Sequence, residues 1–330
     1  MQYKLINTLV LTFANYIACT PDGKRMVVNE VIDTDGACLC NDQKELLRFK
    51  VPPGHCARSP STKPAMSADG NRVAVRINNT ITVYNAVNGN DLKTFKGDFK
   101  FFALTHDGGQ LVTVSQDKRL RVWNTTTGKQ VKKIVTSKRC VRSMAITPDG
   151  KYAITGADDR TAKVWDLGTG DLVVSHQVPF GDVYAVAITP DAKRVAICSY
   201  LWVRIWDVDG QLTCLLKHSH ALQHVELSPA GDLAFTLDTL INIWDANKGL
   251  LLTRINIDIW EWNSLAYAPL ANRIIAIDTD DTLFTYVFWK DKEVWDILVQ
   301  FVFHKDMSGL PLKRIAEFAG FSLKSTQLQL

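Results

Sequence analysis

Three histidines lie close together in the chain, at His218, His220 and His224, and they are the first residues that could do chemistry. Imidazole nitrogens bind transition metals readily, so three of them could hold an ion. A metal site also requires side chains that converge with the geometry that the ion prefers. We interpret these histidines as residues of a connecting loop, and we predict no metal site.

Two other clusters receive a similar interpretation. Asp278, Asp280 and Asp281 carry the oxygen ligands that calcium prefers, but their spacing matches no known calcium loop and favours a tight turn between strands. Cys38 and Cys40 resemble half of a zinc site, but no second pair of cysteine or histidine residues lies nearby.

Basic and aromatic residues gather in two separate stretches. Trp260, Trp262, Trp289 and Trp295 could serve as binding hot spots, although we favour core packing for them. A basic stretch could meet an acidic peptide or phosphates, but a solvated outer strand explains most of it. Because no aromatic residue interleaves with this stretch, nucleic-acid binding is not expected. Its members are Lys129, Lys132, Lys133, Lys138, Arg139 and Arg142.

Motifs of catalysis are missing from the sequence. It contains no glycine-rich phosphate loop and no serine elbow of the hydrolase type. No pair of carboxylates and no His/Cys arrangement can be assembled from it with any specificity. We therefore predict that the protein is not an enzyme, that it has no catalytic residues and that it needs no cofactor.

The composition is that of an ordinary globular protein, with 46% hydrophobic and 22% charged residues among 330. A net charge of +4 is too small to indicate a nucleic acid or an anionic membrane as partner. The seven cysteines are scattered through strand-like segments, which indicates reduced thiols in a cytoplasmic protein, or alternatively a nuclear one. No apolar run reaches the length of about 18 residues that a membrane span needs.

A repeat of about 40 residues must position all of these side chains. Tryptophan followed by Asp or Asn occurs at Trp123, Trp165, Trp206 and Trp244, at spacings of 42, 41 and 38 residues. A turn recurs in phase with them, often as Asp-Gly, because Asp bonds to the backbone and Gly accepts a positive φ. The equivalent turn positions are Asp22, Asp69, Asp107, Asp149, Asp191, Ala230 and Leu270.

Four short apolar runs in each repeat, without a helical period, predict an antiparallel sheet of four strands. One such sheet cannot bury both faces, whereas a closed ring of sheets buries them against each other. Seven turns therefore predict an all-β fold, a seven-bladed β-propeller of four-stranded antiparallel blades. Eight blades are the alternative, because residues 289–310 could supply additional strands.

The predicted propeller is a single domain over residues 1–303, followed by a C-terminal tail over 304–330 in which Leu310–Phe318 could form a short helix. Residues 2–9 are predicted to pair with the last blade and to close the ring, and Glu293–Phe303 competes for the same place. The blades are expected near residues 10–50, 58–97, 98–137, 138–179, 180–219, 220–257 and 258–303.

Residues 145–166 resemble the repeat of the WD-repeat β-propeller family almost throughout, and the resemblance is strong over 98–250. The family buries a network of Trp, Ser/Thr, Asp and His within a blade. Because Gly54-His55 is the only Gly-His dipeptide, complete networks are not expected here. The resemblance implies structural roles for Thr113, Asp117, Trp123, Thr155, Asp159, Trp165, Trp206 and Trp244.

By the same resemblance we expect a non-catalytic scaffold that binds a peptide or protein domain on the face around the central funnel. We expect no membrane association and a monomeric propeller that works within a complex. The expected contacts flank the inner strands: Lys100, Arg142, Tyr184, Asp158, Gln223, Glu261 and Asn263.

Two alternatives remain open at this point. One is a propeller enzyme, such as a quinoprotein-like oxidoreductase or a lactonase, which would require a metal or cofactor in the funnel. The other is a detached sensor module of a signalling NTPase, because the Thr-Pro-Asp-Gly-Lys and Trp-Asp-x-x-Thr-Gly sequences resemble propellers attached to NTPases of the NACHT type.

Overall fold

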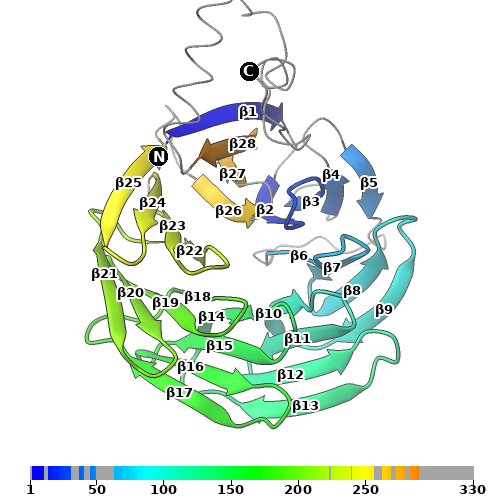
Figure 1. Ribbon diagram of the computed structural model, residues 1–330. Coiled ribbons are helices and arrows are strands. Elements are labelled where there is room, and N and C mark those ends of the chain that lie inside the picture. The colour runs from blue at the N-terminus through cyan, green and yellow to red at the C-terminus, as the bar shows by residue number, and fades with distance from the viewer. Residues whose placement is uncertain are drawn as a thin grey trace, which may run out of the picture.

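The computed structural model describes residues 2–10, 14–30, 37–40, 45–49, 63–222, 224–238, 240–255, 262–268, 273–278 and 282–289. These residues form seven four-stranded sheets, which stand around a common centre (Figure 1). The all-β propeller with seven sheets agrees with the fold predicted from the sequence. Residues 290–310, the main source of extra strands in the eight-bladed alternative, lie outside the described residues.

Six of the sheets are continuous in sequence. The first two comprise β2 (Ala14–Cys19), β3 (Met26–Glu30), β4 (Ala37–Cys40) and β5 (Glu45–Phe49), then β6 (Ala65–Met66), β7 (Arg72–Ile77), β8 (Thr80–Asn85) and β9 (Asp91–Lys96). The next two comprise β10 (Phe99–Leu104), β11 (Gln110–Ser115), β12 (Arg119–Asn124) and β13 (Gln130–Val135), then β14 (Val141–Ile146), β15 (Tyr152–Ala157), β16 (Thr161–Asp166) and β17 (Leu172–Gln177). Two more comprise β18 (Ala185–Ile188), β19 (Arg194–Ser199), β20 (Trp202–Asp207) and β21 (Leu212–Lys217), then β22 (His224–Leu227), β23 (Leu233–Leu237), β24 (Ile241–Asp245) and β25 (Leu250–Ile255).

The seventh sheet joins both ends of the described chain. It contains β26 (Trp262–Ala268), β27 (Arg273–Asp278), β28 (Thr282–Trp289) and, as its outer strand, β1 (Gln2–Val10). β1 runs antiparallel to β28, with Gln2 opposite Trp289 and Val10 opposite Thr282. The pairing of residues 2–9 with the last blade is therefore confirmed, whereas Glu293–Phe303 lies outside the described residues.

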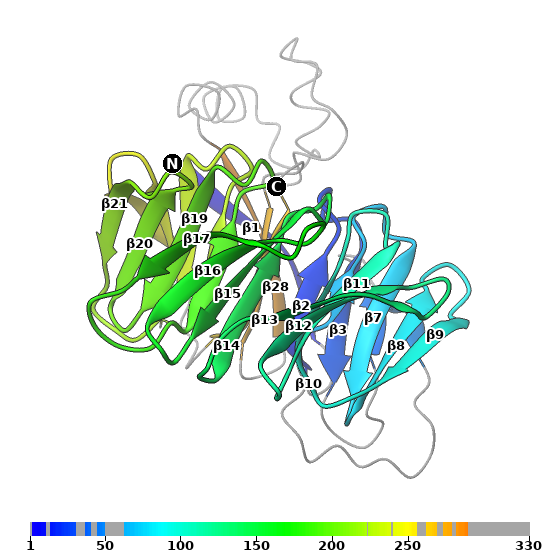
Figure 2. The same ribbon diagram turned by 90° about the horizontal axis from the view of Figure 1, so that it is seen from below.

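The strands nearest the centre of the ring are β2, β6, β10, β14, β18, β22 and β26 (Figure 1). Each of them contacts the innermost strand of the next sheet, and β26 contacts β2. The contacts therefore run once around the ring. Figure 2 shows the sheets from below, with neighbouring sheets standing face against face. Within the described residues, no helix is long and apolar enough to cross a membrane.

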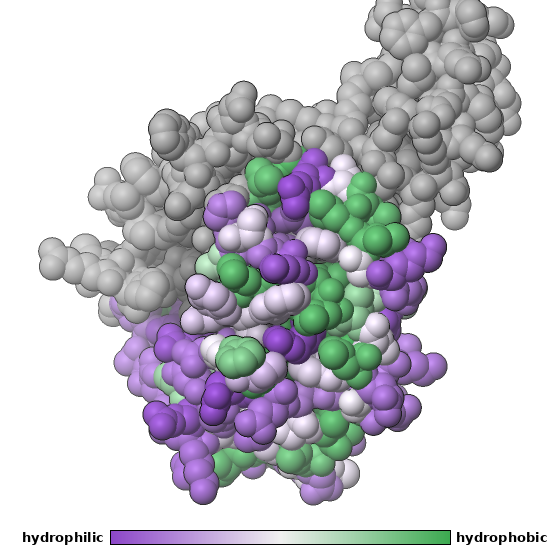
Figure 3. All heavy atoms as spheres, turned by 90° about the vertical axis from the view of Figure 1, so that its left-hand side faces the viewer, coloured by the Kyte–Doolittle hydropathy of each residue, from purple (hydrophilic) through white to green (hydrophobic). Residues whose placement is uncertain are grey.

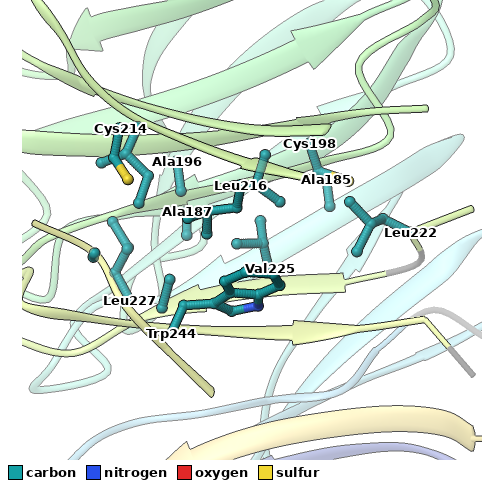
Figure 4. Close-up of a cluster of buried hydrophobic side chains, with 14 residues drawn as sticks. Ala185, Ala187, Ala196, Cys198, Cys214, Leu216, Leu222, Val225, Leu227 and Trp244 are labelled. Atoms are coloured by element: carbon teal, nitrogen blue, oxygen red, sulfur yellow. The ribbon is translucent and has the colours of Figure 1, made fainter. Parts of the chain in front are cut away.

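Apolar side chains fill the space between neighbouring sheets. Between the sheets β18–β21 and β22–β25, the indole of Trp244 lies beside Val225 and faces small side chains that include Ala187 and Ala196 (Figure 4). Alanine on one sheet leaves room for the large ring on the other. Burying one large side chain contributes about 1.5–3 kcal/mol, so seven such interfaces can hold the ring together.

The repeated turns adopt the conformation that their sequence predicts. Between β14 and β15, the Thr147 hydroxyl donates to an Asp149 carboxylate oxygen at 2.6 Å, and the backbone N–H of Lys151 donates to the same oxygen at 3.0 Å. Gly150 has a φ of 70°, a conformation that glycine adopts without steric cost. Equivalent hydroxyl–carboxylate bonds occur at Asp22, Asp69, Asp107 and Asp191.

The outer strands expose apolar side chains between polar ones. Figure 3 shows the side of the ring that carries β21 and β25, where apolar areas interrupt the polar surface. Leu212 at the start of β21 and Leu250 at the start of β25 are among the exposed residues. β25 begins with three consecutive exposed leucines, Leu250, Leu251 and Leu252, and a charged residue, Arg254, follows only near its end.

Candidate functional site

Neighbouring strands run in opposite directions. The turn between the second and third strands of a sheet therefore lies at the same edge as the connection to the next sheet. On three neighbouring sheets this edge carries the turns at residues 115–119, 157–161 and 199–202 and the connections at 135–141, 177–184 and 217–222. We call this surface the loop face. Four of the contact residues expected from the sequence lie on it: Lys100, Arg142, Asp158 and Tyr184.

Arg142 and Asp158 form an ion pair on the loop face. Arg142 is the second residue of β14, and its guanidinium Nε donates to Asp158 Oδ1 in the turn between β15 and β16. The hydrogen bond to Asp158 raises the pKa of Arg142, and the carboxylate charges of Asp158 and Asp182 act in the same direction. The Arg142 side chain keeps 46% of its surface exposed, so it can still contact a partner.

Lys100 and Tyr184 lie on the two sides of this pair. The Lys100 ammonium donates to the carbonyl oxygen of Val141 at 2.7 Å and contacts Cys140 Sγ at 3.2 Å. It therefore links β10 to the beginning of β14. Tyr184 directly precedes β18, and its side chain is 44% exposed. Its backbone N–H donates to the carbonyl oxygen of Cys198, which fixes the backbone at this position.

The remaining expected contacts are less fully described. Gln223 and Glu261 lie outside the described residues. Asn263 belongs to the innermost strand β26 and thus to the inside of the ring, with its backbone alone described. The structure therefore brings Lys100, Arg142 and Asp158 together and places Tyr184 on the next sheet.

The loop face also carries two exposed aromatic residues that the sequence analysis did not single out, Phe180 and Tyr200. Phe180 lies between Pro179 and Gly181, and an aromatic residue in a Pro/Gly connection is a signal of surface exposure. Tyr200 has a φ of 52° and stands in the turn between β19 and β20, where the equivalent turns carry Lys118 and Arg160 at similar φ values.

Two of the repeat tryptophans in neighbouring sheets have the threonine hydroxyl as the partner that the family resemblance implied. The indole N–H of Trp123 donates to Thr113, and that of Trp165 donates to Thr155, both at 2.9 Å. In the sheet β18–β21 the corresponding position is Ile197, so Trp206 has no threonine there. Its indole instead stacks on His176, with ring centroids 4.8 Å apart.

In a connected network the threonine hydroxyl would also bind the turn aspartate, but in the sheets of Thr113 and Thr155 the aspartate has other partners. Asp117 binds the guanidinium of Arg121, because an arginine lies opposite Thr113 on β12. Asp159 accepts instead from the hydroxyls of Ser137 and Thr161, at 2.7 and 2.5 Å. The aspartates therefore fix the neighbouring turn and connection rather than the threonine beside the indole.

One sheet and the connection before it bring together all four residue types of the network, although no complete network forms. Trp244 donates to Thr236 at 2.9 Å, and His218 Nδ1 lies 3.1 Å from Asp238 Oδ2. The His218 and Trp244 rings are 4.9 Å apart, but His218 Nε2 has no hydrogen-bond partner, so the four residues form two separate pairs. A search for Gly-His overlooks His218 because Lys217 precedes it.

The three clustered histidines have three different partners. His218 binds Asp238, His220 Nδ1 lies 3.0 Å from Ser219 Oγ, and His224 Nε2 lies 3.1 Å from Glu226 Oε1. Within the described part of the chain, no group of three His, Cys, Asp or Glu residues has a geometry suited to a metal ion.

The other sequence candidates are dispersed. Asp278 ends β27, whereas Asp280 and Asp281 lie outside the described residues. Cys38 and Cys40 are buried in β4 with their sulfur atoms 3.2 Å apart. Trp262 begins β26 and Trp289 ends β28, whereas Trp260 and Trp295 lie outside the described residues. Of the basic stretch, Lys132 and Lys133 lie on the outer strand β13, and Lys129 directly precedes it.

An ion pair also crosses the inside of the ring. Lys63, just before β6, lies 3.3 Å from Glu226 on β22, although the sheets of these two strands are not neighbours. Burial raises the pKa of Glu226, but the Lys63 charge and the His224 hydrogen bond outweigh it and lower the pKa to about 2. Glu226 is therefore a carboxylate at neutral pH.

Comparison with known proteins identifies repeats in the middle of the chain. The sequence model described as "WD domain, G-beta repeat" matches residues 89–124 and 128–166. Each match begins near the outer strand of one sheet, continues through three strands of the next, and ends at Trp123-Asn124 or Trp165-Asp166. A comparison with curated proteins gives no match to the chain.

Proposed function

Since the chain carries WD40 repeats within a β-propeller, we propose that it is a non-catalytic scaffold that binds a protein or peptide on its loop face. Propellers of this kind typically mediate interactions between proteins. The observation that carries the proposal is the placement of Arg142 and Tyr184. They stand on neighbouring sheets at one edge of the ring, with fixed backbones and exposed side chains.

Rigidity supports this choice of surface. Asp158 fixes the Arg142 guanidinium, and a backbone hydrogen bond to Cys198 holds the backbone of Tyr184. A side chain that is already ordered, such as that of Arg142, loses less entropy when a partner binds, which improves affinity. Arginine and tyrosine also dominate binding energy at protein interfaces. Lys100 contributes indirectly in this proposal, because its ammonium holds the neighbouring strand in place.

The test compares proteins captured by the wild type with those captured by the Arg142→Ala/Tyr184→Ala double variant. The matched control is Lys151→Ala/Lys193→Ala, which changes two exposed residues at the opposite edge of the same two sheets. Quantitative mass spectrometry should show that specific partners are lost from the first variant and retained by the second. Thermal denaturation should show that both variants stay folded. Equal capture by both variants would retire the loop face as the binding surface.

A further inference from the structure

The chemistry of the partner can be inferred from the exposed aromatic residues, an inference that rests on the proposed function. Phe180, Tyr184 and Tyr200 have exposed fractions of 75%, 44% and 59%. Among the residues whose burial the structure describes, no other Phe, Tyr or Trp is exposed. All three lie on the loop face, which is far from the even scatter expected of incidental surface residues.

These three rings belong to one continuous surface. A side-chain carbon at Gly181, next to Phe180, would lie 3.4 Å from the Tyr200 Cβ. On the other side, the Val178 N–H donates to the Arg160 carbonyl oxygen at 2.9 Å. The connection at residues 177–184 therefore lies between the turns at 157–161 and 199–202. It brings the backbone of Arg160 next to the segment that carries Phe180.

Two arginines belong to the turn and the connection next to the segment that carries the rings. Arg139 and Arg160 are exposed, and neither forms an ion pair with any residue that the structure describes. The connection that holds Arg139 is attached to the same turn, because Ser137 donates to Asp159. We call Arg139, Arg160, Phe180, Tyr184 and Tyr200 the aromatic–basic patch.

Two of the three carboxylates near the patch already have partners. Asp158 is paired with Arg142, and Asp159 accepts from two hydroxyls. Asp182 is half-buried, and its charge acts on Arg142. Arg139 and Arg160 therefore leave the patch with positive charge that an acidic partner can balance.

We propose that the aromatic–basic patch binds an acidic peptide segment that carries a bulky apolar side chain. The rings take the apolar side chain, and the guanidinium groups of Arg139 and Arg160 bind carboxylates, a pairing that suits their planar shape. A nucleic acid would also combine stacking with phosphate contacts. It fits less well, because the two guanidinium groups are too few to form the positively charged groove that follows a phosphate backbone.

A peptide-display selection on the folded protein tests this chemistry. We expect the enriched peptides to combine Asp or Glu with an aromatic or large aliphatic residue. A synthetic peptide of that sequence should bind at least 10-fold more weakly to Arg139→Glu/Arg160→Asp and to Phe180→Ala/Tyr200→Asn. Asp and Asn are chosen at positions 160 and 200 because they tolerate a positive φ. The charge-matched control Lys151→Glu/Lys193→Glu, at the opposite edge, should bind like the wild type.

Several results would overturn the inference. The selection could enrich basic peptides or no peptides at all. The acidic peptide could bind the patch variants as tightly as it binds the wild type. A single-stranded oligonucleotide or a phosphopeptide could bind the patch more tightly than the acidic peptide does. The proposed function is judged separately, because Arg142 and Tyr184 are unchanged in the patch variants. If those variants still capture the partners that Arg142→Ala/Tyr184→Ala loses, the inference fails and the loop face remains the binding surface.

Discussion

Hydroxyl groups placed beside indoles are a recurrent feature at the level of single residues. Thr155 and Trp165 are 3% and 7% exposed, and the indole N–H has the Thr155 hydroxyl as its acceptor. A buried donor that loses its acceptor costs its full desolvation energy, about 1–3 kcal/mol. This hydrogen bond therefore contributes to stability mainly because its loss would leave the buried indole N–H without an acceptor.

Replacing Thr155 by Val keeps the shape of the side chain and removes the acceptor. We expect the free energy of unfolding, measured by urea denaturation, to fall by about 1–3 kcal/mol. Thr82→Val is the control, because Thr82 is also buried but its hydroxyl accepts from no indole; it contacts Thr94 at 3.4 Å and Tyr84. Equal losses in the two variants would show that the indole hydrogen bond has no special weight.

The turn aspartates make stability depend on pH. At Asp149, burial raises the pKa, but hydrogen bonds from Thr147 and the Lys151 N–H outweigh it and lower the pKa below its usual value. A pKa that is lower in the folded state adds stability above the unfolded value of about 3.9. That stability is lost as the pH falls through the folded pKa.

Asp149→Asn removes one of these titrating groups. At pH 7 we expect it to lower the free energy of unfolding by about 0.5–1.5 kcal/mol, the usual range for one hydrogen bond. The difference from the wild type should shrink as the pH falls below about 3.9 and through the lower folded pKa, because the wild-type carboxylate then becomes protonated too. Urea denaturation across this range checks the prediction, and a difference that stays constant with pH would contradict it.

The sequence predicted these residues unevenly. Thr155 and Trp165 were recognisable because both occur at fixed offsets from the turn at Asp149. The partners of Asp117 and Asp159 were not, because Arg121, Ser137 and Thr161 follow no repeated pattern. Exposure of Phe180 and Tyr200 depends on how connections of different sheets pack together, which spacing along the chain does not encode.

At the level of whole strands, β1 has the largest effect on the ring. It is the outer strand of a sheet whose other three strands come from the opposite end of the described chain. The sequence identified residues 2–9 by their likeness to an outer strand. The sequence alone could not exclude Glu293–Phe303 as the outer strand. Both segments are apolar enough to pair with the same sheet edge, and the residue pattern does not show which of them pairs more strongly.

Replacing residues 2–10 by glycine and serine tests the role of β1. Each backbone hydrogen bond contributes about 0.5–1.5 kcal/mol, so the loss of this strand should cost several kcal/mol. Differential scanning calorimetry should show a Tm lower by roughly 10 °C or more. Addition of a synthetic peptide with the sequence of residues 2–10 should restore part of that loss. An unchanged Tm would show that β1 is dispensable for closure.

At the level of the whole molecule, the ion pair between Lys63 and Glu226 acts across the ring. The two residues are far apart in the chain and belong to sheets that are separated by two others on one side. No sequence pattern indicates this contact, because lysine and glutamate are common and the contact exists only after the ring has formed. Repetition predicts the sheets, whereas contacts across the centre require the assembled ring.

A double-mutant cycle with Lys63→Met and Glu226→Gln measures the strength of this contact. Because both side chains are about one-third exposed, we expect a coupling energy of about 0.5–1 kcal/mol from urea denaturation. In Lys63→Met alone, the pKa of Glu226 should rise because the neighbouring positive charge is lost, which NMR titration can follow. Additive effects of the two substitutions would show that the ion pair contributes no coupling.

The pairing of β1 with β28 also determines when the ring can close during synthesis of the protein. About 280 residues separate the two strands, and a ribosome adds about 5–20 residues per second. After its synthesis β1 therefore waits roughly 15–55 s for its partner, while six sheets can fold in the order of their synthesis. During that interval the nascent chain presents an unpaired β-strand, which makes it a natural client for molecular chaperones.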